Sequence, residues 1–98
     1  MIDGVPSLQA VGDHWAVSGA ITMDSVVDLL AASASLAMPP GGVVDLEHID
    51  RVDSAGVALL LDWKRRAAAE GMPLQFSGVP QNMMSLALLY GVEDMLGA

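Results

Sequence analysis

The stretch "VVDLEHIDRVDSAGVALLLDW", residues Val43–Trp63, decides the fold. It opens with a short apolar strand over Val43–Leu46, and "EHIDRVD" predicts a polar link from this strand to a helix that starts at about Ser54. Asp53 and Ser54 stand directly before a small residue and a glycine. Such a pair can mark a nucleophile, a phosphorylation site, a helix cap or a docking surface.

Upstream of this stretch, the sequence predicts a hairpin and a helix. "SLQAV" and "HWAVSG" flank a Gly12-Asp13 turn and read as two strands. Asp24 is a suitable N-cap for "SVVDLLAASASLA", in which apolar residues recur at helical spacing. Pro39–Gly42 predicts the turn that ends this helix.

Downstream, the helix from Ser54 should end at Glu70, because Gly71 and Pro73 follow as stop signals. "LQFSG", Leu74–Gly78, alternates like a strand, and "VEDML" favours a short final turn. Pro80 opens a last helix that Gly91 closes. The order β-β-α-β-α-β-α predicts an α/β domain over residues 1–98, with parallel neighbours in its sheet.

The composition excludes several function classes. Four basic and twelve acidic residues give a net charge of −8, which disfavours nucleic acid and anionic lipid as partners. There is no cysteine, and His14 and His48 are not in metal-ligand spacing, so we expect no metal and no cofactor. The apolar runs are too short to span a membrane and no leader pattern is present, which predicts a cytoplasmic protein.

The Asp-Ser pair does not resemble a catalytic centre. A nucleophile elbow requires a glycine two residues before the serine, and none precedes Ser54 there. We therefore expect no enzymatic activity and no small-molecule substrate. The simplest interpretation is that Ser54 caps the helix, with Asp53 near the positive end of the helix dipole.

The helix that begins at Ser54 carries more apolar residues than one core-facing stripe needs. At 100° per residue the core stripe contains Gly56, Leu60, Trp63 and Ala67, with Leu59 beside it. Val57, Ala58 and Leu61 fall outside that stripe, together with Arg65. Either a partner covers these residues, or neighbouring helices cover Val57 and Leu61.

The stretch "VVDLEHIDRVDSAGVALLLDWKRRAAAEGMPLQFSGV" resembles the STAS domain, the fold of anti-sigma-factor antagonists. The resemblance implies a mixed sheet of about four strands, with helices largely on one face. "VDSAGVALLL", Gly78-Val79 after the last strand, and the helix "LALLY" are most similar to one branch, the small STAS subunits of Mla phospholipid-transport complexes.

This resemblance implies a non-catalytic subunit that binds a cytoplasmic ABC ATPase and, through it, lies near a permease at the inner membrane. In kinase-regulated antagonists the phosphorylated residue directly precedes the glycine. That position is Ala55 here, so no phosphorylation is expected, and Ser54 is the only candidate. Partner switching as an anti-sigma-factor antagonist is the alternative. The residues expected to bind the partner are Asp53, Ser54, Ala55, Val57, Ala58, Leu61 and Arg65.

Overall fold

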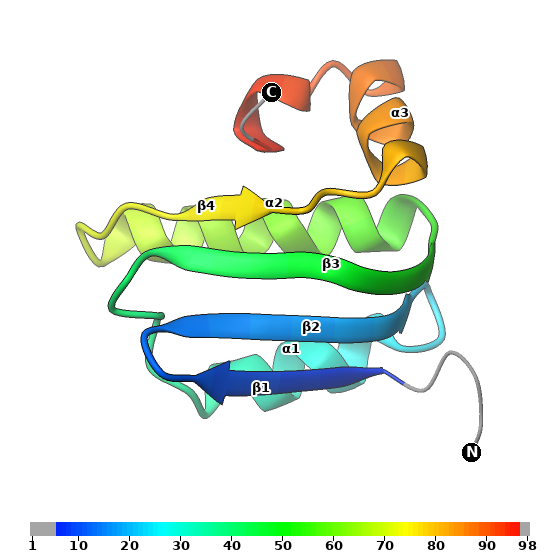
Figure 1. The fold of residues 1–98 in the computed structure, drawn as a ribbon. Coiled ribbons are helices and arrows are strands. Elements are labelled where there is room, and N and C mark those ends of the chain that lie inside the picture. The colour runs from blue at the N-terminus through cyan, green and yellow to red at the C-terminus, as the bar shows by residue number, and fades with distance from the viewer. Residues whose placement is uncertain (1–5, 97–98) are drawn as a thin grey trace.

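A computed structural model describes residues 6–96 and contains one four-stranded sheet (Figure 1). The strands are β1 (Ser7–Val11), β2 (His14–Ile21), β3 (Val43–Val52) and β4 (Gln75–Ser77). They lie side by side in chain order. β1 pairs antiparallel with β2, whereas β2, β3 and β4 are parallel. The mixed sheet implied by the resemblance to the STAS domain is therefore confirmed.

The helices are α1 (Val26–Ala34), α2 (Ser54–Ala69) and α3 (Gln81–Leu89), followed by a short 3₁₀ segment, η1 (Glu93–Leu96). Figure 1 shows α1 and α2 behind the sheet, on one face, with α3 and η1 beyond the β4 edge. The predicted element order is confirmed. Within residues 6–96, no helix has the length and apolar character needed to cross a bilayer.

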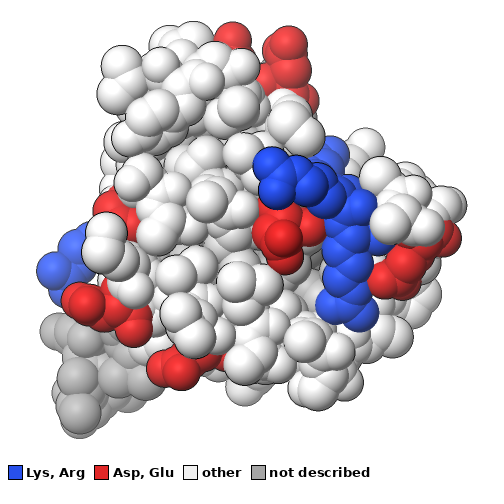
Figure 2. Space-filling view, turned by 180° about the vertical axis from the view of Figure 1, so that it is seen from behind, with Lys and Arg blue, Asp and Glu red and all other residues white. Residues whose placement is uncertain are grey.

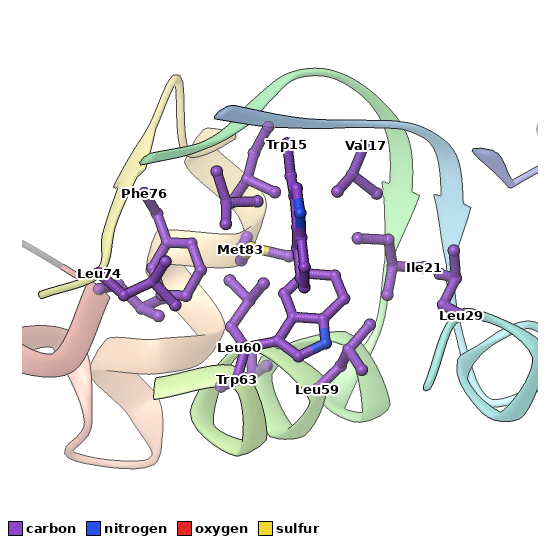
Figure 3. Packing of buried hydrophobic residues seen from close by; sticks show 14 of the residues in the cluster. Trp15, Val17, Ile21, Leu29, Leu59, Leu60, Trp63, Leu74, Phe76 and Met83 are labelled. Carbon is purple, nitrogen blue, oxygen red and sulfur yellow. The ribbon is translucent and has the colours of Figure 1, made fainter. Parts of the chain in front are cut away.

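The core lies between the sheet and α2 (Figure 3). Trp15 and Val17 point from β2 toward Leu59, Leu60 and Trp63 of α2. The two tryptophan rings meet edge to face, with their centroids 5.4 Å apart, a preferred geometry for aromatic pairs. The predicted core stripe of α2 is confirmed, since all five of its residues are buried.

The third strand is longer than predicted. The sequence placed a polar link after Leu46, but β3 continues to Val52 because its second half pairs with the end of β2. A register shift separates the pairs Ala16–Asp45 and Ser18–His48, and this bulge interrupts the alternation that identifies a strand in sequence. The polar residues of "EHID" are exposed within the strand, and only Ile49 of this stretch is half-buried.

The first helix does not use the predicted cap. Asp24 lies in the turn before α1, and the N-cap position belongs to Ser25, whose side chain makes no capping hydrogen bond. The buried Ser25 hydroxyl instead donates to the carbonyl oxygen of Ala20 at 2.8 Å and accepts from the Thr22 N–H at 3.0 Å. It thus anchors the turn to the end of β2.

The topology places the starts of α1 and α2 at the same end of the sheet, where the strands β2 and β3 finish. Each helix follows one of two parallel strands, β2 and β3, and returns along the same face, so the two helices run in the same direction. In open α/β sheets this end, at the carboxyl ends of the strands, is the usual location of binding sites.

Candidate partner-binding site

Asp53 joins the start of α2 to the turn that precedes α1. Its Oδ1 accepts a hydrogen bond from the Ala55 N–H at 2.8 Å, and its Oδ2 accepts one from the Met23 N–H at 3.0 Å. Asp53 is therefore the N-cap of α2, and the prediction that Ser54 caps this helix is wrong. Ser54 is the first helical residue, and it is exposed.

Gly56 permits the close approach of α2 to the sheet. A Cβ atom at this position would lie 2.4 Å from Cγ2 of Val52 and 2.8 Å from the backbone oxygen of Ile21. Real Cβ contacts are essentially never this short, so any larger residue would push α2 away from β2 and β3. The glycine in "DSAG" therefore has a packing role, which the sequence pattern did not reveal.

The residues predicted to bind a partner separate into buried and accessible groups. Val57 is only 2% exposed and belongs to the core, so its prediction as a surface residue is wrong. Leu61 is half-buried and packs against the core. Asp53 and Ala55 are also half-buried, whereas Ser54, Ala58 and Arg65 are exposed. A contact of these accessible residues with a partner stays a prediction.

An apolar groove of about 350 Å³ runs between α1 and α2. We call it the α1–α2 groove, and its lining residues are Val26, Leu30, Ala55, Ala58, Leu59, Asp62 and Arg65. Three of the predicted residues therefore meet here, namely Ala55, Ala58 and Arg65. Leu61 does not line the groove, because it lies on the opposite flank of α2 from Leu59.

The sequence analysis missed the contribution of α1. Val27 is 70% exposed and Leu30 is 38% exposed, while Met23 in the preceding turn is 74% exposed. Val26, Val27, Leu29 and Leu30 span more of a helix circumference than one stripe can bury, and only Leu29 among them is fully buried. This surplus was the available signal that one face of α1 is unpartnered.

Hydrogen bonds near the end of α1 hold the groove walls together. Nε1 of Trp63 donates to the buried Ser33 hydroxyl at 2.9 Å. The Arg66 guanidinium donates to the carbonyl oxygens of Ser33 at 2.8 Å and Leu36 at 2.6 Å, and its Nε contacts Glu70 at 2.9 Å. Arg66 of α2 thereby binds the last turn of α1 and the segment directly after it.

A second cavity, of about 530 Å³, adjoins the starts of both helices at the carboxyl ends of β2 and β3. Its charged lining residues are Asp24, Asp28, Asp53 and Arg51, and we call it the acidic pocket. Among the described residues, the only side-chain ion pairs within 4.0 Å are Asp13–His14 and Arg66–Glu70. The charges of the acidic pocket are therefore not paired within the described part of the chain.

The titratable residues do not form a catalytic group with Ser54. His14 begins β2, at the opposite edge of the sheet from the start of α2. Asp45, Glu47 and His48 in β3 each have one possible metal-ligand atom, and these three atoms lie within 4.8 Å of one another. Two of these three residues are exposed, and none of them lines the α1–α2 groove or the acidic pocket.

Comparison with known proteins identifies the family. Residues 7–97 match the family described as "Mlab, STAS domain". The chain is 31% identical over 86 residues to the intermembrane phospholipid transport system binding protein MlaB of Escherichia coli (strain K12), and the match covers 88% of each chain. The protein of the same name from Shigella flexneri matches with the same identity and coverage.

The fold is also that of an anti-sigma factor antagonist. The structure of SpoIIAA in its unphosphorylated form matches with a TM-score of 0.67, over 93% of this chain and 84% of the other. At 16% identity this likeness concerns the fold alone. The match over residues 7–97, with the identity to two MlaB proteins, shows that the chain belongs to the MlaB-like STAS domain family.

Proposed function

We propose that this chain is a non-catalytic subunit that binds the cytoplasmic ABC ATPase of an Mla-type phospholipid-transport system. In this proposal the chain lies on the cytoplasmic side of the inner membrane, where it is held through the ATPase and contacts the permease only indirectly. The observation that carries the proposal is the 31% identity, over 88% of both chains, to proteins named as binding proteins of an intermembrane phospholipid transport system.

The surface around the α1–α2 groove supports this proposal. Figure 2 views the molecule from the side opposite to that of Figure 1 and shows a broad uncharged area between scattered acidic and basic groups. Leu30 of α1 lines the groove together with Ala58 of α2, and Met23 and Val27 expose further apolar side chains on α1 and the turn before it. Exposed apolar area of this kind, bordered by polar residues, is typical of a protein-binding surface.

The proposal assigns no chemistry to Ser54. Its hydroxyl is at the surface, and neither histidine lies among the residues that line the adjoining groove or pocket. A serine nucleophile requires a base within hydrogen-bond reach. We therefore propose that this chain binds the ATPase and supports its assembly, and that the chain itself catalyses no reaction.

Co-purification with the Mla-type ATPase of the same organism tests the proposal directly. We expect a stable complex with the unmodified chain and a loss of binding by orders of magnitude for Ala58→Asp. An unpaired charge in the centre of an interface typically costs several kcal/mol. The matched control is Ala68→Asp, which places the same charge at an exposed position near the end of the same helix.

Both variants should keep the fold, because both alanines are exposed. Thermal melts of the isolated proteins verify this before binding is compared. Equal binding by Ala58→Asp and the unmodified chain would place the interface elsewhere. Failure of the unmodified chain to bind the ATPase would refute the proposed function.

Partner switching as an anti-sigma-factor antagonist is less well supported. In the related kinase-regulated antagonists the modified hydroxyl directly precedes the motif glycine, and this chain has Ala55 there. We expect protein purified from its native cells to carry no phosphate at this motif. Mass spectrometry that finds stoichiometric phosphate on Ser54 would revive the antagonist alternative.

A further inference from the structure

The charges around the α1–α2 groove are distributed unevenly, and this constrains the partner that fits it. Asp24 and Asp28 lie beside the start of α1, where they line the acidic pocket. Arg65 lies at the other end of the groove, together with Asp62. Val26 of the groove wall follows Ser25 of the pocket lining, and Ala55 of the groove lies two residues after Asp53 of the pocket, so the groove and the pocket adjoin at the starts of α1 and α2.

We infer that the segment of the ATPase that occupies the α1–α2 groove is apolar and ends in one or more Lys or Arg side chains, which lie over the acidic pocket. This inference rests on the proposed function and specifies the chemistry and orientation of the partner. The apolar part of the segment covers Leu30 and Ala58, and its basic end lies toward the starts of α1 and α2 rather than toward Arg65.

The balance of charges at the pocket favours a cation. Asp24, Asp28 and Asp53 contribute three negative charges, and Arg51 offsets one of them. The helix N-termini of α1 and α2 each add roughly half a positive charge. About one net negative charge remains, and the chain as a whole carries −8.

A second copy of the chain does not meet these requirements. With a net charge of −8 and only four basic residues, two copies repel one another over the distance at which electrostatic steering acts. The opposite charges of a basic segment would instead accelerate its association and fix its orientation on the surface.

The test compares the binding of the ATPase to the unmodified chain and to Asp24→Asn/Asp28→Asn, by titration at several salt concentrations. Neither carboxylate accepts a hydrogen bond in the described structure, so the double variant should fold normally. We expect it to bind roughly five- to tenfold more weakly at low salt, mainly through slower association, and to show a smaller dependence on salt.

The control is Glu47→Gln/Asp94→Asn, which removes the same number of charges from exposed residues of β3 and η1. If this control weakens binding as much as the α1 variant does, only the overall charge matters and the inference is wrong. Unchanged binding by Asp24→Asn/Asp28→Asn would also overturn the inference, while loss of binding by Ala58→Asp in the same series would leave the proposed function intact. If the unmodified chain does not bind the ATPase, the proposed function fails and the inference fails with it.

Discussion

At the scale of single residues, the residues of the "DSAG" motif have roles that differ from those the sequence suggested. Asp53 uses both carboxylate oxygens within the fold, one on α2 and one on the turn before α1. Gly56 provides the space in which α2 approaches Ile21. Ser54 makes no such contact and is exposed, which leaves it available to a partner.

Asp53→Ala should destabilise the fold by about 1–2 kcal/mol, because it removes the helix cap and a bond to the Met23 N–H. In a domain of this size, each kcal/mol corresponds to a fall of roughly 4–8 °C in Tm. Ser54→Ala should change stability by no more than about 0.5 kcal/mol. Thermal denaturation of both variants measures the difference, and a larger loss for Ser54→Ala would mean that the cap is wrongly assigned.

At the scale of helices and strands, the site depends on how α1 is held against α2. The two helices are joined by Trp63 and Arg66, which reach the end of α1 through three hydrogen bonds. The starts of the helices are joined through Asp53. The groove between them is therefore supported at both ends, and its walls keep a defined separation.

Arg66→Ala should lower the free energy of unfolding by about 2 kcal/mol, because hydrogen bonds from a charged group to half-buried carbonyls contribute about 1.5–3 kcal/mol. Arg65→Ala provides a control that removes the same side chain from an exposed position one residue earlier. We expect the control to fall within about 0.5 kcal/mol of the unmodified chain. Urea denaturation measures both values. If the two variants have the same free energy of unfolding, Arg66 does not hold α1 in place.

Leu60→Asp and Val57→Asp should both abolish folding, because each places a charge in the core. Leu61→Asp should be tolerated better, because Leu61 is half-buried and the introduced carboxylate can reach water. Circular dichroism melts rank the three variants. If Val57→Asp remained as stable as Leu61→Asp, the packing of Val57 against the core would be contradicted.

At the scale of the whole molecule, the chain has a small core, a strongly acidic surface and an apolar groove on its helical side. The groove begins at the starts of α1 and α2, next to the acidic pocket at the carboxyl ends of β2 and β3. This combination is suited to a protein partner with apolar and basic residues. It is poorly suited to nucleic acid, which an acidic protein repels.

The purified chain alone should hydrolyse neither simple esters nor phosphate esters, because Ser54 lacks a positioned base. Colorimetric assays with p-nitrophenyl acetate and p-nitrophenyl phosphate measure this. Turnover that disappears in Ser54→Ala would contradict a purely binding role. Turnover that persists in the variant would indicate a contaminating enzyme.

The sequence by itself determined the order of elements and the core stripe of α2, whereas the mixed sheet was implied by the resemblance to the STAS domain. These features depend on local periodicity and on turn and stop residues, which remain readable in a single chain. The helical spacing of Gly56, Leu60, Trp63 and Ala67 identified the buried face of α2 without any knowledge of the elements that pack against it. The short stretch "VDSAGVALLL" was likewise sufficient to indicate the family.

Only the tertiary structure decided which residues are accessible and which partners they have. Val57 lies outside the core stripe in sequence, yet the surrounding fold buries it. Asp53, rather than Ser54, caps α2, because its extended backbone precedes the helix and also places a carboxylate oxygen at the Met23 N–H. The α1–α2 groove joins residues about thirty positions apart, and contacts of this kind depend on how elements pack rather than on local sequence.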